Sequence, residues 1–350
     1  MSDQPPVHSV KLALLGFGNV GQAFAQLLLN KRRDLAENPG VQFQVVGIAT
    51  GSHGTAINPD GLSLQKTLQA VREGTSLDEF SLQPVQDSQE FIQTCGADVL
   101  LETTPVNYQN GQPALEYLTL GLNQGMHAVT ANKGPVVHGY RQLKELARER
   151  KRAFLFESAV MDGAPVFSIA RCGLPGARVT GLSGILNSTT NLILTRMEEG
   201  ESYDQAVAYT QSIGIAETDP SGDVDGWDAA IKVAALVTVL MNVPLTPDQV
   251  DRTGIREITG ENIEQVLSRG QRWKLVCGAR RDRDQPDVIK AWVRPEMVNA
   301  DSPLYNVSGT SSILQIESDV LGNLSLIEEN PSPMTTAYGL LADTLNALGV

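Results

Sequence analysis

Five carboxylates gather in a twelve-residue stretch that leads directly into an apolar segment with a single lysine. The acids are Glu217, Asp219, Asp223, Asp225 and Asp228. The apolar segment runs to residue 240 and contains Lys232. A lysine in such surroundings is largely removed from water, which raises the cost of its charge and makes it useful for proton transfer. The segment predicts either acid–base chemistry on a polar, positively charged substrate or a structural cluster, and on its own it does not separate the two.

Two simpler interpretations of this segment concern calcium and helix structure. An EF-hand loop beginning at Ser221 would place Lys232 at the twelfth position, where a bidentate glutamate is required, so a calcium loop is excluded. Asp228 and Lys232 are four residues apart, which also fits a plain helical ion pair worth ~0.2–0.5 kcal/mol. Asp225 is expected to cap the apolar helix.

A second lysine, Lys133, is the last residue of the segment 127–133, which is expected to form a strand, and it should lie beyond that strand's carboxyl end. Open α/β sheets bind ligands beyond the carboxyl ends of their strands, although a lysine at such a place can also be simply solvated. Two lysines and several acids beside a dinucleotide site would suit reduction of a carbonyl in a substrate that carries its own ammonium and carboxylate. One lysine would then protonate the developing alkoxide.

A glycine-rich turn near the amino terminus predicts that dinucleotide site. It follows an expected strand at residues 10–15, opens a helix, and consists of Gly16, Phe17, Gly18, Asn19, Val20 and Gly21. In this pattern the first glycine makes the tight turn, the second admits a pyrophosphate, and the third lets the helix pack on the strand. A turn rich in glycine for its own sake is the alternative, but the strand and helix on either side favour a cofactor.

The residues after the second expected strand bear on which cofactor binds. NAD-binding folds place an acid there to hold the ribose hydroxyls, and this chain has Thr50 and Gly51 instead. Ser52, His53 and Thr55 have side chains that can bind a 2′-phosphate, or they are ordinary loop residues. This pattern favours NADP, or the use of both NADP and NAD, over strict NAD.

Strands that alternate with helical patterns in the first part predict an α/β fold of the Rossmann type, with a doubly wound parallel sheet. Its strands are expected at 10–15, 41–50, 97–105 and 127–133. An α+β substrate and dimerisation domain should follow, with strands at 153–160, 177–191, 272–281 and 287–295, a hairpin over 311–327 turning at 322–323, and helices at 165–172, 202–214, 226–240 and 334–348. We expect a dinucleotide-binding domain at 1–152, a catalytic domain at 153–309, and a segment at 310–350 that returns to the first domain.

The composition narrows the class of protein. The chain has 350 residues, enough for about two domains. Its net charge of −13 argues against a nucleic-acid partner, because phosphate binding needs a basic surface. Three widely spaced cysteines fit reduced thiols in the cytoplasm. The start has no signal-peptide pattern and no apolar run reaches the ~20 residues that span a bilayer, so we expect a cytoplasmic protein without membrane contact.

The sequence resembles homoserine dehydrogenases over nearly its whole length and in that family's order. The resemblance lies in the segments GFGNVGQAF, ETTPVNYQNGQPALEYLTLGLNQGMHAVTANKGPV, FESAVMDGAPVFS, GILNSTTNLILTRM, AETDPSGDVDGWDAAIKVAAL and DSPLYNVSGTSSILQIESDVLGNLSLI. It implies NAD(P)H-dependent reduction of L-aspartate 4-semialdehyde to L-homoserine, and the reverse reaction, in threonine, methionine and isoleucine biosynthesis. It also implies a homodimer or homotetramer.

The resemblance assigns roles to individual residues. It implies that Lys232 is catalytic, that Glu217, Asp223 and Asp228 bind the substrate, and that Lys133 is the second lysine of the site. It implies cofactor contacts from the turn at 16–21 and from Thr103, Thr104 and Lys133. The segment FESAVMDGAP resembles the family's monovalent-cation loop, which implies a sodium ion (Na⁺) bound by Glu157 and the carbonyls of Val160, Asp162 and Ala164; those carbonyls are alternatively turn caps.

The chain also departs from the family. Before its last helix it keeps Thr336 and Ala337 but lacks a glycine-rich stretch that family members often have near the nicotinamide. The sequence ends after that helix, so feedback inhibition through a carboxy-terminal regulatory domain is not expected. Two other classes remain open: a different NAD(P)-dependent dehydrogenase on the same fold, and an inactive nucleotide-binding regulator, which should have lost one of the two lysines.

Overall fold

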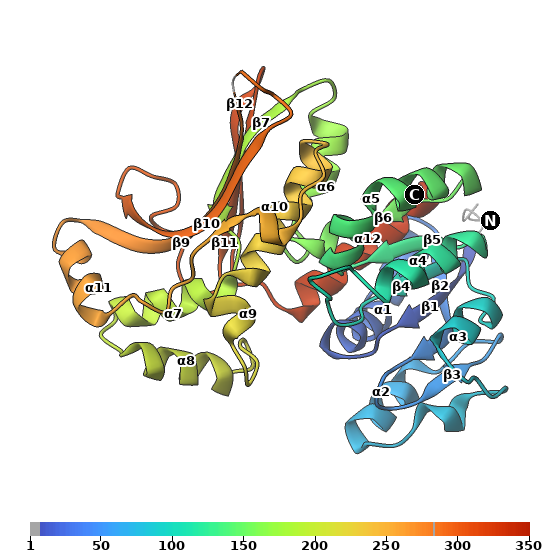
Figure 1. Cartoon of the computed structure of the whole chain (residues 1–350). Coiled ribbons are helices and arrows are strands. Elements are labelled where there is room, and N and C mark those ends of the chain that lie inside the picture. The colour runs from blue at the N-terminus through green and yellow to red at the C-terminus, as the bar shows by residue number, and fades with distance from the viewer. Residues whose placement is uncertain (1–7, 283) are drawn as a thin grey trace. The chain divides into compact units, whose positions relative to one another are not determined.

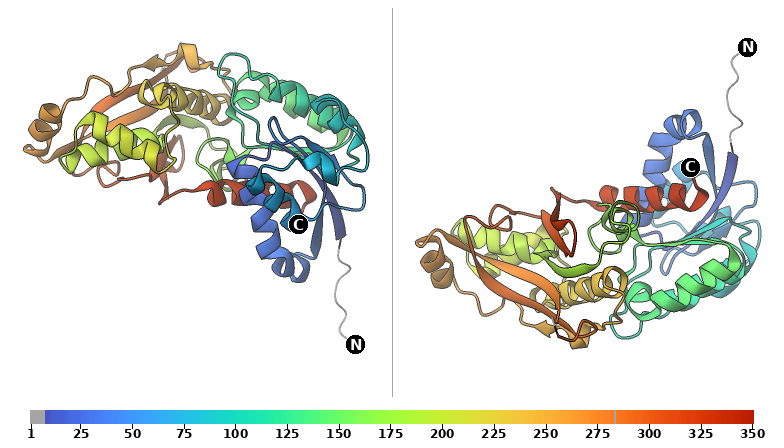
Figure 2. Two further views of the ribbon diagram at one scale, coloured as in Figure 1. Left: turned by 90° about the horizontal axis from the view of Figure 1, so that it is seen from below. Right: turned by 90° about the horizontal axis from the view of Figure 1, so that it is seen from above.

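A computed structural model describes residues 8–282 and 284–350 and divides the chain into two units (Figures 1 and 2). The first unit is Met1–Pro165 with Ser332–Val350, and the second is Val166–Pro331. Residues 1–7, which carry part of the signal-peptide argument, lie outside the described residues. Within the described ranges, none of the helices combines the length and apolar character needed to cross a bilayer.

The first unit is built on a six-stranded sheet in the order β3-β2-β1-β4-β5-β6. Its strands are β1 (His8–Leu15), β2 (Val41–Ala49), β3 (Thr55–Ile57), β4 (Val99–Glu102), β5 (His127–Thr130) and β6 (Phe154–Leu155). All neighbours pair in parallel except β2 and β3, which are antiparallel. The sequence order reverses between β1 and β4, so this pair forms the switch point at which such sheets bind ligands.

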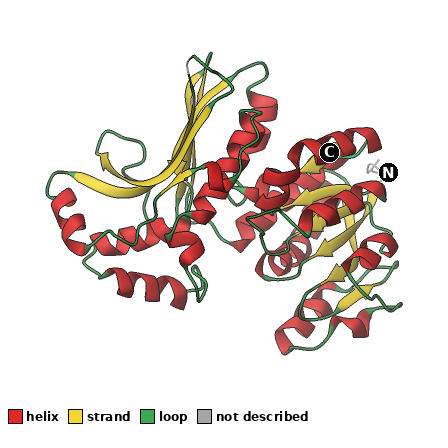
Figure 3. Cartoon of the chain, viewed as in Figure 1, coloured by secondary structure: helices red, strands yellow, loops and turns green. Residues whose placement is uncertain are grey.

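Helices cover both faces of this sheet, as Figure 3 shows. They are α1 (Asn19–Glu37), α2 (Leu64–Glu73), η1 (Leu77–Phe80), α3 (Ser88–Thr94), α4 (Ala114–Asn123), α5 (Lys133–Arg150), η2 (Glu157–Ala159) and α12 (Pro333–Leu348). One apolar core joins α1 and α12 to the sheet through side chains such as Phe24 and Leu340, and a second core joins α3 to the other face through Phe91. The predicted Rossmann-type, doubly wound α/β architecture is confirmed.

The second unit is built on a mixed six-stranded sheet in the order β12-β11-β7-β9-β10-β8. Its strands are β7 (Val179–Ile185), β8 (Asp251–Arg252), β9 (Gln271–Arg281), β10 (Ile289–Asn299), β11 (Ser312–Ser318) and β12 (Gly322–Glu328). Its helices are α6 (Val166–Ser168), η3 (Ile169–Gly173), α7 (Ser188–Glu198), α8 (Tyr203–Ser212), α9 (Ser221–Val224), α10 (Trp227–Leu240), η4 (Pro247–Gln249) and α11 (Gly260–Leu267). Helices α7, α10 and α11 pack against β9, and α8 packs against α7.

Several expected elements differ from the structure. The strand expected at 177–191 ends at Ile185, because the Asn187 side chain caps a helix that begins at Ser188. The strand expected at 153–160 is reduced to β6, and η2 follows it. The hairpin turns at 319–321, since Ser318 pairs with Gly322.

The observed unit boundaries also lie elsewhere than the expected 152/153 and 309/310. The first moves toward the carboxyl terminus because β6 extends the first sheet beside β5. The second moves because β11 and β12 pair with each other and β11 pairs with β7, so only α12 belongs to the first unit.

Candidate active site

The glycine-rich turn links β1 to α1, and each glycine has a distinct environment. Gly16 has φ +103°, and a Cβ there would lie 2.6 Å from the Thr103 hydroxyl. A Cβ on Gly21 would lie 2.6 Å from the Gly16 carbonyl, so α1 packs closely on the turn. A Cβ on Gly18 would meet nothing within 4 Å, which leaves open space at the middle of the turn. These are the three roles that a pyrophosphate-binding turn requires.

The amino terminus of α1 has the features of an anion site. Its N-cap is Gly18, no side chain caps it, and its first turn contains no acid. The amides of that turn and the positive end of the helix dipole therefore favour a bound phosphate. Asn19 is exposed, whereas Phe17 is buried in the core that joins α1 to the sheet.

The loop after β2 contains an acid that the local sequence does not show. Thr50 closes a tight turn, because its amide and hydroxyl donate to the Gly54 carbonyl and its hydroxyl oxygen accepts from the His53 amide. Asp78, from η1, accepts a hydrogen bond from the amide of Thr55 at 2.7 Å. The expectation that no acid lies near the end of β2 is therefore incomplete, since one arrives from 23 residues further along the chain.

A fully buried carboxyl, Glu102, holds the loops that follow β4 and β5. It accepts hydrogen bonds from the Thr104 amide at 2.7 Å and from the Thr130 hydroxyl at 2.6 Å. Asn132 caps α5 by accepting from the Gly134 amide at 3.0 Å. Its side-chain amide donates to the Thr104 carbonyl at 3.1 Å, so the two loops are bound to each other.

These contacts place the residues expected to serve the cofactor. Lys133 is the first residue of α5 and is partly buried. The Thr103 hydroxyl donates to the Gly16 carbonyl at 3.1 Å, and the Thr104 hydroxyl donates to Glu102. Burial raises the pKa of the Glu102 carboxyl, and the hydrogen bonds it accepts oppose that rise. Thr103, Thr104 and Lys133 all follow the carboxyl ends of adjacent parallel strands in the first unit.

In the second unit, helix α10 carries the lysine that the sequence singles out. Its N-cap is Gly226, in the left-handed conformation with φ +81°, and no side chain caps it. The expectation that Asp225 caps this helix is wrong. Asp225 forms an ion pair with Arg256 instead, and its carbonyl accepts from Arg252, whose guanidinium stacks on Trp227 at 3.8 Å.

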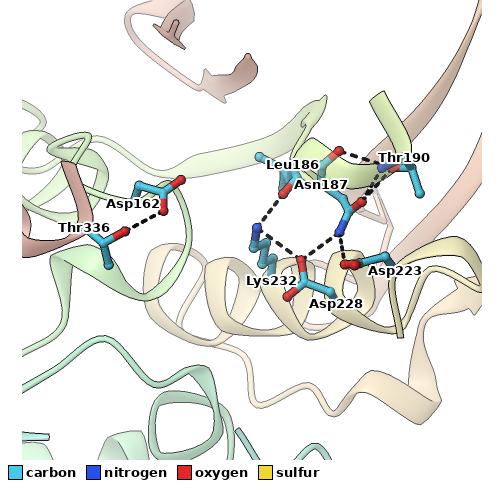
Figure 4. A network of polar contacts seen from close by, with 8 residues as sticks. All are labelled: Asp162, Leu186, Asn187, Thr190, Asp223, Asp228, Lys232 and Thr336. Atoms are coloured by element: carbon cyan, nitrogen blue, oxygen red, sulfur yellow. Dashed lines mark hydrogen bonds and ion pairs between the residues drawn. The ribbon is translucent and has the colours of Figure 1, made fainter. Parts of the chain in front are cut away.

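Lys232 lies within a compact cluster of acids and amides (Figure 4). Its Nζ is 3.1 Å from Asp228 Oδ2 and donates to the Leu186 carbonyl at 2.6 Å. The Lys232 and Asp228 side chains are 14% and 13% exposed, so the pair is mostly shielded from water. The Asn187 side-chain amide donates to Asp223 Oδ1 at 2.7 Å and to Asp228 Oδ2 at 3.0 Å.

Asn187 Nδ2 donates to two carboxylates, and bringing these two negative charges close together has an electrostatic cost. Burial raises the pKa of the Asp223 carboxyl, and the negative charge of Asp228 raises it further. Hydrogen bonds from Asn187 and Thr189 and the charge of Lys232 lower it, without cancelling the rise. The Asp223 carboxyl is therefore easier to protonate than an exposed aspartate.

Of the residues expected to bind substrate, Asp223 and Asp228 lie together with Lys232, whereas Glu217 is in an exposed loop. Gln211 of α8 donates to the Glu217 carbonyl at 3.2 Å and holds that loop. Sequence reasoning missed Asn187. Its signal was an asparagine between an expected strand and a polar stretch, which is the pattern of an N-cap.

The segment expected to bind a cation lies in the first unit between β6 and α6, against α12. Glu157 is buried, and its amide donates to Asp343 at 2.6 Å. Asp162 has φ +40° and accepts from the Thr336 hydroxyl at 2.7 Å (Figure 4). Val160 is buried and Ala164 is partly buried. In the described residues no three or more His, Cys, Asp and Glu side chains form a metal-binding group, so any cation here would depend on carbonyls and one carboxylate.

A second buried lysine escaped the sequence reasoning. Lys274 of β9 is fully buried, and its Nζ donates to Asn191 Oδ1 at 3.3 Å. Burial lowers the pKa of Lys274 to about 8, and the charge of Glu198 opposes the change. Lys274 lies between Trp273 and Leu275 in a strand that was expected, but lysines are almost never fully buried, so its burial was not predicted.

Comparison with known proteins decides the family. The family model for the homoserine dehydrogenase NAD-binding domain matches residues 16–157, and the homoserine dehydrogenase model matches residues 165–345. The chain belongs to the homoserine dehydrogenase family. It is therefore an NAD(P)-dependent oxidoreductase, as the resemblance implied.

Relatives match over almost the whole chain. The NAD(+)-dependent homoserine dehydrogenase of Pseudomonas canavaninivorans is 34% identical over 96% of this chain and 95% of its own length. The homoserine dehydrogenase of Methanocaldococcus jannaschii is 34% identical over 96% of this chain and 97% of its own. A hyperthermophilic archaeal homoserine dehydrogenase in complex with NADPH superposes with a TM-score of 0.80 at 28% identity, covering 97% of this chain and 98% of its own.

Proposed function

We propose that this homoserine dehydrogenase interconverts L-homoserine and L-aspartate 4-semialdehyde through the cluster of Asp223, Asp228 and Lys232. The main support for this proposal is that a lysine shielded from water shares a hydrogen-bonded cluster with two acids in the second unit. The substrate has an ammonium group and, as the aldehyde, a carbonyl to be reduced. Those two groups need an anionic site and a proton donor, respectively.

The acids bind the substrate ammonium in this proposal. Asp228 already accepts from Lys232 and Asn187, and Asp223 accepts from Asn187, so both carboxylates are held in fixed directions. Charged hydrogen bonds of this kind contribute ~1.5–3 kcal/mol each. Glu217 joins them from its exposed loop, a role supported by the family resemblance of the segment from Glu217 to Lys232.

Lys232 is the proton donor in the proposed reduction. A hydride added to the aldehyde carbon breaks the carbonyl π bond and leaves the electron pair on oxygen, and a proton from Nζ completes the alcohol. In the reverse direction Nζ takes the hydroxyl proton as hydride leaves carbon. Asp228 and the Leu186 carbonyl fix the direction of Nζ. Lys133 is the alternative donor, or it positions substrate or nicotinamide.

The cofactor would be held in the first unit. When bound, NAD(P)H supplies the hydride for the reduction. The turn at 16–21 and the uncapped amides of α1 fit its pyrophosphate, because Gly18 leaves open space that a side chain would fill. Thr103, Thr104 and Lys133 would contact it from the ends of β4 and β5. We propose a monovalent cation near Glu157, held with the carbonyls of Val160, Asp162 and Ala164, as a structural element outside the chemical step.

We further propose that the enzyme works in the cytoplasm, without nucleic-acid partners, as a homodimer or homotetramer. Support for the location comes from the reduced-thiol pattern, with Cys95 and Cys277 buried and no disulfide partner needed. The net charge of −13 supports the absence of nucleic acid. Light scattering of the purified enzyme would measure the oligomer directly.

The direct test is a comparison of initial rates of oxidation of L-homoserine, L-serine and 4-hydroxybutyrate, each with NAD⁺ and NADP⁺. We expect L-homoserine to give by far the highest kcat/KM, because 4-hydroxybutyrate lacks the ammonium and L-serine is one methylene too short. Equal rates with 4-hydroxybutyrate would contradict binding of the substrate ammonium by the acids. No oxidation of any of the three would point to a different dehydrogenase on the same fold.

A further inference from the structure

Asn187 has an uncharged side chain and lies at the centre of the cluster formed by Asp223, Asp228 and Lys232. It is buried and lies between β7 and α7. Its two ends make different contacts. The oxygen Oδ1 accepts from the Thr190 amide and hydroxyl, each at 2.8 Å, and thereby caps α7. The nitrogen Nδ2 donates to Asp223 and Asp228.

The capping contact fixes which way the nitrogen points. Because Oδ1 is committed to the amino terminus of α7, the planar amide directs both protons of Nδ2 away from the helix and toward the acids. The carboxylates come from two different elements, Asp223 from α9 and Asp228 from α10. The preceding carbonyl, that of Leu186, accepts from Lys232. One strand-to-helix turn therefore contacts both acids and the lysine.

We infer that Asn187 is a positioning residue, which holds Asp223 and Asp228 side by side as an ionised pair for a substrate ammonium. This inference rests on the proposed function and deepens it. Without a donor between them, two neighbouring ionised carboxylates repel each other, and one takes up a proton or turns away. With the donor, both can accept from the same cation.

The groups that face Asp223 are known from each element around it in the second unit. They are Asp228 and Lys232 of α10 and Asn187 and Thr189 at the start of α7. Of these, Asp228 and burial raise the pKa of Asp223, and the other three groups lower it. Removal of the Asn187 nitrogen should therefore raise the pKa of Asp223 further. The ionised pair would then form only at higher pH.

The chain offers substitutions that separate capping from donation. Asn187→Ser keeps a capping oxygen, since serine is a good N-cap, but has no second donor for the acids. Asn187→Asp keeps the cap and the size of the side chain and adds a third carboxylate. Thr190→Val is the matched control: it removes the hydroxyl that Oδ1 accepts from and leaves both Nδ2 donations in place.

The first measurement is kcat/KM for homoserine across pH, with the affinity for NADPH from fluorescence titration. For Asn187→Ser we expect KM for homoserine to rise roughly tenfold, the acid limb to move to higher pH, and NADPH affinity to stay unchanged. Asn187→Asp should move the limb further, and Thr190→Val should leave it in place. If Asn187→Ser has the KM and the acid limb of the wild type, Asn187 acts only as a helix cap. If Thr190→Val shifts the acid limb equally, the effect comes from capping and not from the donation to the acids.

A second measurement needs no substrate, so it separates this inference from the proposed function. A raised folded-state pKa means that stability from Asp223 is present at low pH and is lost as pH rises through that pKa. Urea unfolding across pH should show this loss at higher pH in Asn187→Ser and Asn187→Asp than in the wild type. If the wild type does not oxidise homoserine but the unfolding curves shift this way, the proposed function fails and the positioning role stands. Identical unfolding profiles in all four proteins would overturn the positioning role.

Discussion

Replacement of Lys232 by methionine is the most direct test of the proposed proton donor. Methionine is also long and unbranched, so it fills the same space among the buried residues of α10. If Lys232 donates the proton, its loss removes an interaction that strengthens only in the transition state. General acid catalysis contributes ~10²–10⁴-fold, or ~3–5 kcal/mol of barrier. We expect kcat to fall within that range and NADPH affinity to stay unchanged.

The substitution also has a predictable effect on stability. It leaves Asp223 and Asp228 without the positive charge of a pair whose side chains are 14% and 13% exposed. Loss of one partner from a buried pair costs ~3–5 kcal/mol. Here the cost should lie below that range, because Asp223 has a raised pKa and can take up a proton. The loss of Tm in Lys232→Met should accordingly be smaller at pH 6 than at pH 8.

The assay is steady-state homoserine oxidation and aldehyde reduction by Lys232→Met, Lys133→Met and Lys290→Met. Lys290 of β10 is the matched control, because its side chain is 76% exposed and pairs with Asp282, the residue after β9. Wild-type kcat in Lys232→Met together with inactivity in Lys133→Met would reverse the two roles. Full activity in both would make water the donor and refute the account of the shielded lysine.

Three further outcomes are expected. Glu217→Gln should lower kcat/KM for homoserine by about 10-fold to 150-fold, the equivalent of one charged hydrogen bond, and an equal loss of NADPH affinity by fluorescence titration would contradict its substrate role. Thr50→Asp should shift the ratio of kcat/KM toward NAD, since a carboxylate at the end of β2 repels a 2′-phosphate, and an unchanged ratio would mean that the 2′ group lies elsewhere. Because the pKa of Lys274 is lowered from 10.5 to about 8, the folded state binds fewer protons between these values and wild-type stability should rise by about 3 kcal/mol from pH 8 to 10.5. Lys274→Met should lack that rise in urea unfolding.

The sequence predicted those parts of the fold that depend on contacts between residues close together in the chain. The turn at 16–21 was predictable because each glycine answers a steric need of its immediate neighbours. The start of α8 was predictable because Ser202 and Gln205 form a capping box within four residues. Apolar residues on nearly every side of α10 similarly indicated a buried helix.

The remaining features depend on contacts between distant residues. Asp225 looked like a cap for α10, but an arginine 31 residues later takes its carboxylate. The stretch 188–191 looked extended, with its β-branched threonines, until Asn187 capped it as a helix. Asp78 reaches the loop after β2 from another element, and the buried Lys274 donates to Asn191, 83 residues earlier in the chain. Residue spacing within a short segment does not reveal such contacts, because their partners are far away in the sequence.

The cluster around Lys232 also shows why its acids outnumber its lysine. With Asp223 and Asp228 both ionised, the three side chains carry a net charge of −1, which burial makes unfavourable in the folded protein. In the proposed function a bound ammonium would neutralise that charge, so the free energy that the charge costs in the folded protein would be recovered on binding. An alcohol or aldehyde without an ammonium would leave the charge uncompensated and would bind weakly. In the proposed function the repulsion between the two acids would thus favour an amino acid as substrate, and the inferred role of Asn187 is to keep both acids ionised until the substrate binds.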